Sequence, residues 1–408
     1  MKRFTQWIAA SPASMRYVMI VGFGCMLYFI LQKLHHRDGV SEFEIYYNAS
    51  GAFLEGKPLY GEVFNGTTGT YTYAPFTAIL FSVFHLFPYS FAISIYYFLV
   101  LAGYMLFTLS LVYFLEKEYQ LVPKNRGWLL FLITAFMFDH FERELHIGNV
   151  NVFLLIMAFW VFFLMRRDRP VYGGIVLGMM MLFEPYTLII WPYFLYRRNY
   201  WMVFSGLMTF AVGLVVPAFF HGLSNNLTLI HQWFDVLLSP GVPLVDSPNT
   251  LYGMYHQWVL NPLHLAVGNW LLIAVWIVVA TCLFYFFRKN KLASTQPWTD
   301  FAEYALIVSL VPHLVHTDTD HFMWTWPLVT LGFILLQYVQ GISKRMLYTL
   351  LCIAFIPLVI NSPDIVGRKI MLLFDEGGLL GLGNLLLVGC SVYLIARFSK
   401  SGVQPERA

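Results

Sequence analysis

The sequence predicts an all-α protein built as a polytopic membrane helix bundle. Hydrophobic residues make up 59% of the 408 positions and charged residues 12%, about half the share typical of soluble domains. The mean hydropathy is +0.64. Many apolar residues fall in runs of about 20, the length that an α-helix needs to cross a bilayer. The net charge of +3 is spread over short loops, which argues against a nucleic-acid partner.

The apolar runs predict the helices in order along the chain. The clearest spans cover residues 14–34, 91–115, 151–165, 200–220, 268–287, 300–317, 322–340, 346–361 and 379–398. Shorter pieces at 76–88 and 127–139, and an interrupted one at 171–196, predict short re-entrant or broken helices. The expected total is about 10 to 12 spans. Because no repeat or low-complexity linker divides the chain, residues 1–408 are predicted to form one domain.

Basic clusters predict which turns face the cytoplasm. They fall at 2–3, 166–169, 197–198, 288–291 and 344–345. Under the positive-inside rule, the loops at 35–75, 221–257, 317–321 and 362–378 then face outward. Counting spans forward from the N-terminus and backward from Arg166 gives opposite parity across 76–150, so at least one short piece there is expected to enter the membrane and return.

The first outward loop, 35–75, crowds acidic, aromatic and glycine residues beside the first span. It contains Glu42-Phe-Glu44-Ile-Tyr46, then Leu54-Glu-Gly56-Lys-Pro-Leu-Tyr60, then Tyr73-Ala-Pro75. A protein built mostly for lipid has little reason to place carboxylates there unless they meet something polar. The alternative is an amphipathic surface helix whose acidic side chains are simply solvated.

A second polar stretch, from Asp139 to Asn151, lies between apolar helices. It contains Arg143, His146 and Asn149. Ionisable residues at membrane depth are costly unless they line a cavity, which favours a site. The alternative is an exposed loop with pairs between neighbouring helical turns, such as Glu142 with His146.

These stretches resemble glycosyltransferase family 87, whose members have the GT-C fold and use polyprenyl-phosphate sugars. The family's first outward loop reads D-x-x-x-Y, L-x-G-x-x-L-Y and Y-x-P, and Glu42 occupies the place of its catalytic aspartate. Its later G-Q-x-N phrase corresponds to Gly148-Asn149-Val150-Asn151. The resemblance implies an inverting, metal-independent enzyme without a cofactor. It would move a hexose such as mannose from a polyprenyl-phosphate donor to a glycan or glycolipid acceptor outside the cytoplasmic membrane.

The resemblance and the side-chain chemistry together imply roles for individual residues. Glu42 would act as general base and remove the proton of the attacking acceptor hydroxyl. Arg143, His146 and His321 would hold the donor phosphate, because a guanidinium fork matches phosphate oxygens. The pocket for sugar and acceptor is expected to include Glu44, Tyr46, Tyr60, Tyr73, Asn149, Asn151 and Asp320.

Two further segments leave alternatives open. Residues 312–321 carry three histidines and two aspartates with helical spacing, which fits a divalent ion, a phosphate contact by His321, or structural pairing with carboxylates. Glu184-Pro185 stands where the family usually has lysine and proline, so the charge is inverted where a donor phosphate would benefit from a cation. A lipid or polysaccharide transporter and a non-catalytic envelope-assembly subunit are the competing functions. Transporters bury polar residues near the bilayer midplane in related halves, a pattern not evident here.

Overall fold

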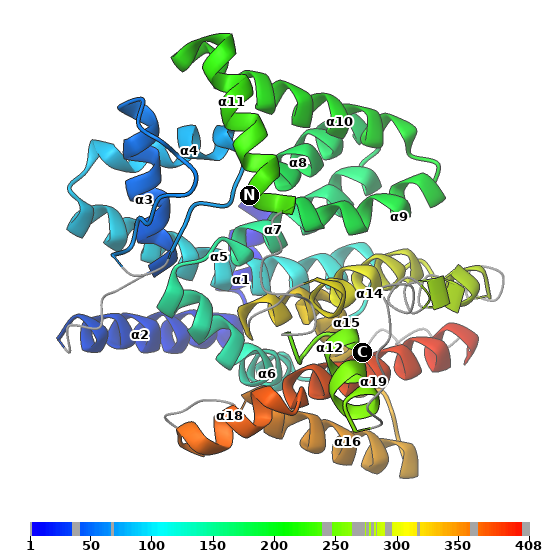
Figure 1. Cartoon of the computed structure of the whole chain (residues 1–408). Coiled ribbons are helices and arrows are strands. Elements are labelled where there is room, and N and C mark those ends of the chain that lie inside the picture. The colour runs from blue at the N-terminus through cyan, green and yellow to red at the C-terminus, as the bar shows by residue number, and fades with distance from the viewer. Residues whose placement is uncertain are drawn as a thin grey trace. The chain divides into compact units, whose positions relative to one another are not determined.

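The computed structural model describes residues 2–34, 41–66, 69–238, 247–262, 296–315, 319–359 and 366–401, with positions 274, 277–278, 281–282 and 284–289. The chain divides into two compact units. Unit 1 comprises Met1–Ile20, Leu106–Phe141 and Val242–Ala408, and unit 2 comprises Val21–Met105 and Glu142–Gly241. Apart from an isolated bridge between Val63 and Thr70, the regular structure of the described residues is helical (Figure 1).

Three helices are long and apolar enough to cross a membrane: α2 (Pro12–Leu34), α5 (Tyr89–Glu118) and α19 (Leu379–Ser401). Two bent pairs qualify if each counts as one span. They are α6 (Arg126–Ile147) with α7 (Asn151–Arg166), bent by 120°, and α10 (Tyr200–Val215) with α11 (Ala218–Leu238), bent by 95°. The predicted fold class, a helical membrane bundle with broken helices, is confirmed.

Unit 2 holds most of the residues expected in the site. Its other elements are α3 (Ser41–Leu54), α4 (Pro75–Phe81), η1 (Ser82–Leu86), α8 (Pro170–Phe183), η2 (Pro185–Ile190) and α9 (Trp191–Tyr196). Helix α8 packs against α7 and α10 (Figure 1). Glycines permit the close approach to α10, since a Cβ added at Gly174 would lie 2.3 Å from Met202 O.

Unit 1 is built around α15 (Trp326–Leu336), every residue of which is buried. A helix that is apolar on all sides must be enclosed, and α15 packs against α14 (Thr299–Leu314) and α19. The remaining elements are α1 (Lys2–Ala9), α12 (Leu251–Tyr255), η4 (His256–Leu260), η5 (Thr319–Thr325), α16 (Ile342–Val359) and α18 (Arg368–Glu376).

Two segments expected to be outward loops contain helices instead. Helix α11 is kinked at Gly222 (φ +79°) and runs on to Leu238, and α18 covers Arg368–Glu376 within 362–378. Helix α18 carries apolar residues on one side and polar residues on the other, so its average hydropathy is too low to mark it as a span. In α11, polar residues such as Asn225 and Asn226 interrupt the apolar run. The predicted span at 268–287 lies largely outside the described residues, so the total of 10 to 12 spans stays a prediction.

In unit 1, the end of α5 binds the N-terminal helix α1 through a buried carboxylate. Glu116 Oε1 accepts a hydrogen bond from Trp7 Nε1 at 3.1 Å, and Glu116 Oε2 accepts one from Arg126 Nη2 at 2.7 Å. The Arg126 guanidinium also lies 4.3 Å from the Trp7 ring centroid. The carboxylate therefore joins three helices, and the cation stacks on the indole that the carboxylate also binds.

Glu116→Gln is expected to destabilise unit 1 by about 2 kcal/mol, because hydrogen bonds to charged groups contribute roughly 1.5–3 kcal/mol. Thermal unfolding of the purified protein in detergent measures the loss. Glu62→Gln, the same change at an exposed position, is the matched control. Equal melting temperatures for the two variants would contradict the stabilising role of Glu116.

Candidate functional site

Helix α3 presents Glu42 and Tyr46 on one face, because the two residues are four positions apart. The Tyr46 hydroxyl lies 3.4 Å from Glu42 Oε2. Tyr46 is 2% exposed and Phe43 is fully buried, so this part of α3 faces the interior of unit 2. Glu44 is two positions from each of Glu42 and Tyr46, on a different face, and its side chain forms no hydrogen bond or ion pair with the described residues.

Tyr73 reaches the same place from the segment before α4. Three hydrogen bonds hold this segment: Tyr60 Oη to Tyr73 O at 2.7 Å, Trp233 Nε1 to Thr72 O at 3.0 Å, and Ala74 N to Leu182 O at 3.1 Å. The Tyr73 hydroxyl lies 2.8 Å from the Tyr46 hydroxyl. Tyr60 was expected in the sugar pocket. Its hydroxyl donates to the main-chain carbonyl of Tyr73 and so positions Tyr73.

Asn149 joins the two tyrosines at the bend between α6 and α7. Its Oδ1 accepts hydrogen bonds from Tyr46 Oη at 3.1 Å, Tyr73 Oη at 3.2 Å and Val150 N at 2.8 Å. Gly148 precedes it with φ +71°, a conformation that favours glycine and lets the chain leave α6 sharply. Glu42, Tyr46, Tyr73 and Asn149 thus form one cluster, called the polar network below.

The main chain of Asn149 is held as well. Tyr96 Oη on α5 donates to Asn149 O at 2.7 Å. Two residues on, Asn151 is 1% exposed, and its Oδ1 accepts a hydrogen bond from Tyr186 Oη at 3.2 Å. Four chain segments therefore converge on the bend: α3, the segment before α4, α5 and η2.

Burial is the main cause that raises the pKa of both network tyrosines. For Tyr46 the pKa lies well above its usual range, and Tyr73 and the Glu42 carboxylate raise it further. For Tyr73 the pKa is raised by burial and next by the Glu184 carboxylate, although the hydrogen bond with Tyr46 partly offsets this. Both phenols are therefore protonated near neutral pH and act as hydrogen-bond donors, which leaves proton removal to a carboxylate.

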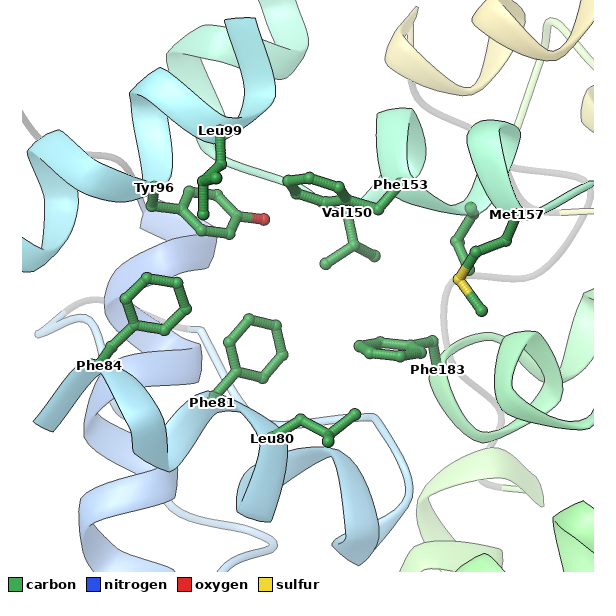
Figure 2. Close-up of a pocket in the computed structure, with 10 residues that line it drawn as sticks. Leu80, Phe81, Phe84, Tyr96, Leu99, Val150, Phe153, Met157 and Phe183 are labelled. Atoms are coloured by element: carbon green, nitrogen blue, oxygen red, sulfur yellow. The ribbon is translucent and has the colours of Figure 1, made fainter. Parts of the chain in front are cut away.

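A pocket of about 190 Å³ adjoins the polar network (Figure 2). Its lining is almost wholly apolar and consists of Leu80, Phe81, Phe84, Tyr96, Leu99, Val150, Phe153, Leu154, Met157 and Phe183. We call it the aromatic pocket. Two of its rings contact the network directly, because Phe81 stacks on Tyr46 with centroids 4.6 Å apart and Phe183 meets Tyr73 edge-on at 6.0 Å.

Arg143 and His146 lie on the last turns of α6, in the same unit. Arg143 is half-buried, and the His146 side chain makes no hydrogen bond or ion pair with the described residues. The alternative pairing of Glu142 with His146 is not formed, since Glu142 accepts a hydrogen bond from Tyr28. Glu144 Oε1 accepts from Val152 N at 3.0 Å and so caps the start of α7. Phosphate binding by Arg143 and His146 stays a prediction.

Asp320 and His321 belong to unit 1, where they pair with each other. His321 Nδ1 lies 3.4 Å from Asp320 Oδ1, and Asp320 is fully buried. Nearby, His313 Nε2 lies 2.9 Å from Asn384 Oδ1. His316 and Asp318 fall outside the described residues. Within the described part of the chain, no group of three histidine, cysteine or acidic side chains is arranged to hold a metal ion.

Three residues of this region were not predicted as site residues. Tyr96 and Tyr186 carry no sequence signal, because each acts through a single hydroxyl from a helix otherwise used for packing. Glu184 was noted only as a departure from the family pattern. The preceding residue, Phe183, contacts the Tyr73 ring, and the Glu184 carboxylate raises the pKa of Tyr73.

The sequence profile of glycosyltransferase family 87 matches residues 71–317, which is more than half of the chain. The match includes Tyr73, Asn149 and Glu184 and begins after Glu42. No curated protein and no solved structure matches the chain. The chain belongs to glycosyltransferase family 87 and is a membrane enzyme that transfers a sugar from a donor to an acceptor.

Proposed function

We propose that this chain is a GT-C-type hexosyltransferase of the cytoplasmic membrane. It takes a hexose such as mannose from a polyprenyl-phosphate carrier and passes it, with inversion and without a metal, to a glycan or glycolipid on the outer side. The observation that carries the proposal is that the polar network bearing Glu42 adjoins the aromatic pocket within unit 2. A lipid-linked sugar requires both surfaces side by side.

The polar network supports the chemistry of the transfer. The acceptor hydroxyl must lose its proton as its oxygen bonds to the anomeric carbon, and Glu42 accepts that proton. The bond from the anomeric carbon to the phosphate oxygen breaks with its electron pair leaving on the phosphate. Because phosphate leaves readily, no general acid is needed. Inversion requires the acceptor and the phosphate to be on opposite faces of the sugar. Arg143 and His146, on the last turns of α6, are the candidates in unit 2 for the phosphate.

The aromatic pocket supports a lipid carrier. Its lining offers no charge, and its volume suits a short branched hydrocarbon segment such as the isoprene unit next to the phosphate. Burying a group of five carbons contributes roughly 4 kcal/mol, since each buried CH₂ contributes about 0.8 kcal/mol. The pocket therefore favours a polyprenyl-phosphate sugar over a nucleotide sugar, whose leaving group is strongly polar.

The donor class is tested with purified protein in lipid nanodiscs. Radiolabelled polyprenyl-phosphate hexoses and the matching nucleotide hexoses are each supplied with a panel of alkyl glycoside acceptors. Transfer from the lipid-linked donors alone is the expected result. Transfer from the nucleotide donors alone, or from neither class, would refute the proposed donor.

Leu99→Trp is expected to raise KM for the polyprenyl donor about tenfold and to leave kcat little changed, because the larger side chain fills the aromatic pocket. A tenfold change corresponds to about 1.4 kcal/mol of binding free energy. Leu99 is 42% exposed at the pocket rim, so unit 2 can accommodate the change. Phe98→Trp on the same helix, 64% exposed and outside the pocket, is the matched control. An unchanged KM in Leu99→Trp would remove the pocket from donor binding.

A further inference from the structure

The C-terminal end of α8 is attached to the segment that carries Tyr73. Leu182 O accepts the hydrogen bond from Ala74 N at 3.1 Å, and the Phe183 ring contacts the Tyr73 ring at 6.0 Å. Glu184 is the next residue and ends the helix, with φ −134° and ψ 102°. The chain thus changes from helical to extended backbone where it passes the polar network.

The residues after Glu184 are fixed just as firmly. Glu184 O accepts hydrogen bonds from Thr187 N at 3.0 Å and Thr187 Oγ1 at 2.8 Å, which closes the turn into η2. Tyr186 Oη then donates to Asn151 Oδ1 at 3.2 Å. Glu184 therefore lies between a residue that contacts Tyr73 and one that binds Asn151, and its half-buried side chain has a defined place at the site.

The two carboxylates of this region come from different chain segments: Glu42 belongs to α3, and Glu184 follows the last residue of α8. Glu42 is within 3.4 Å of the Tyr46 hydroxyl, and the Tyr46 hydroxyl is 2.8 Å from that of Tyr73. Glu184 raises the pKa of Tyr73 more strongly than Glu42 does, whereas for Tyr46 the neighbouring carboxylate that matters is Glu42. Through its neighbour Phe183, Glu184 is thus joined to the Tyr73 side of the pair, whereas Glu42 contacts the Tyr46 side.

We infer that Glu184 binds the sugar of the donor by accepting hydrogen bonds from its hydroxyls. The inference rests on the proposed function and deepens it by assigning a specificity residue to the same site. An ionised carboxylate only accepts hydrogen bonds, and its two oxygens suit neighbouring sugar hydroxyls. Such charge-assisted bonds are about twice as strong as neutral ones.

The inference is tested by removing each partner of the contact separately. Wild type and Glu184→Ala, purified in nanodiscs, are assayed with a polyprenyl-phosphate hexose and its 2-, 3-, 4- and 6-deoxy forms. Removing a contacted hydroxyl should lower kcat/KM of wild type at least tenfold. The same removal should lower kcat/KM of Glu184→Ala less than threefold, because the partner is already absent. Replacing a residue with only a structural role would change kcat/KM for all these donors by a similar factor, with no selective effect at one hydroxyl.

Two controls separate the possible failures. Glu62→Ala, at an exposed position, should discriminate the deoxy donors as wild type does. If Glu184→Ala does not fold, Glu184→Asp supplies the readout: the carboxylate is kept but its reach is shortened, so discrimination should weaken. If wild type transfers the hexose and the Glu184 variants discriminate the deoxy donors fully, the inference fails and the proposed function stands. If wild type uses no polyprenyl-phosphate hexose at all, both fail.

Discussion

Glu42→Gln should lower kcat for sugar transfer by about 10²- to 10⁴-fold, the range that a general base contributes. The amide keeps the size of the side chain and can still accept a hydrogen bond from Tyr46, so the fold of α3 is preserved. It cannot take up the acceptor proton. The neighbouring phenols cannot replace it, because burial raises the pKa of Tyr46 and of Tyr73 and keeps both protonated.

The effect is measured by single-turnover transfer from a radiolabelled polyprenyl-phosphate hexose, with thermal unfolding as a check on the fold. KM for the donor should change little, since the base acts on the acceptor. Glu62→Gln makes the same chemical change at an exposed position and should leave kcat unchanged. Turnover of Glu42→Gln within threefold of wild type would show that another group removes the proton, and Glu184 would then be the next carboxylate to examine.

Gly174→Val should prevent recovery of folded protein, or lower its stability by about 3 kcal/mol or more, because overpacking of a tight interface forces backbone shifts. A Cβ at Gly174 would lie 2.3 Å from Met202 O and 2.9 Å from Gly206 N, both main-chain atoms of α10. A flexible side chain can yield to a new neighbour, but a helix backbone cannot. Helices α8 and α10 would have to separate.

The matched control is Gly24→Val on α2, where an added Cβ meets nothing within 4 Å. Both positions are helical, so the change in helix propensity is the same and only the packing differs. Yield of monodisperse protein and melting temperature in detergent give the comparison. Equal values for the two variants would show that α8 and α10 tolerate a wider spacing.

The sequence predicted the three single helices that can cross a membrane, α2, α5 and α19, because about 20 apolar residues in a row have few alternatives to a membrane helix. It failed for α18, whose apolar residues occupy one side only, and for α11, whose apolar run is interrupted by polar residues such as Asn225 and Asn226. The short run at 127–139 becomes the much longer α6, which ends at Ile147. Its polar extension is stabilised by partners distant in sequence, such as Tyr28 for Glu142, and these cannot be read from a local pattern.

Sequence motifs identified four residues that the structure brings together: Glu42, Tyr46, Tyr73 and Asn149. They could be found because each belongs to a short phrase with fixed spacing. The same reasoning grouped Tyr60 with the sugar pocket, but its hydroxyl binds a main-chain carbonyl, and spacing does not reveal which atom a side chain binds. Glu184 was missed as a site residue because it breaks the family pattern. The contact of the preceding Phe183 with Tyr73 shows that this part of the chain lies beside the polar network.

The hydrogen bond between Tyr46 and Asn149 joins residues 103 positions apart in the chain. A ribosome therefore delivers Glu42 and Tyr46 to the membrane well before their partner is synthesised. A nascent chain that stops before the α6–α7 bend should carry an unshielded acid and two unsupported phenols. Competence for transfer then arises late in biogenesis, after α8 has inserted, and prematurely terminated chains should be inert and exposed to quality-control proteolysis.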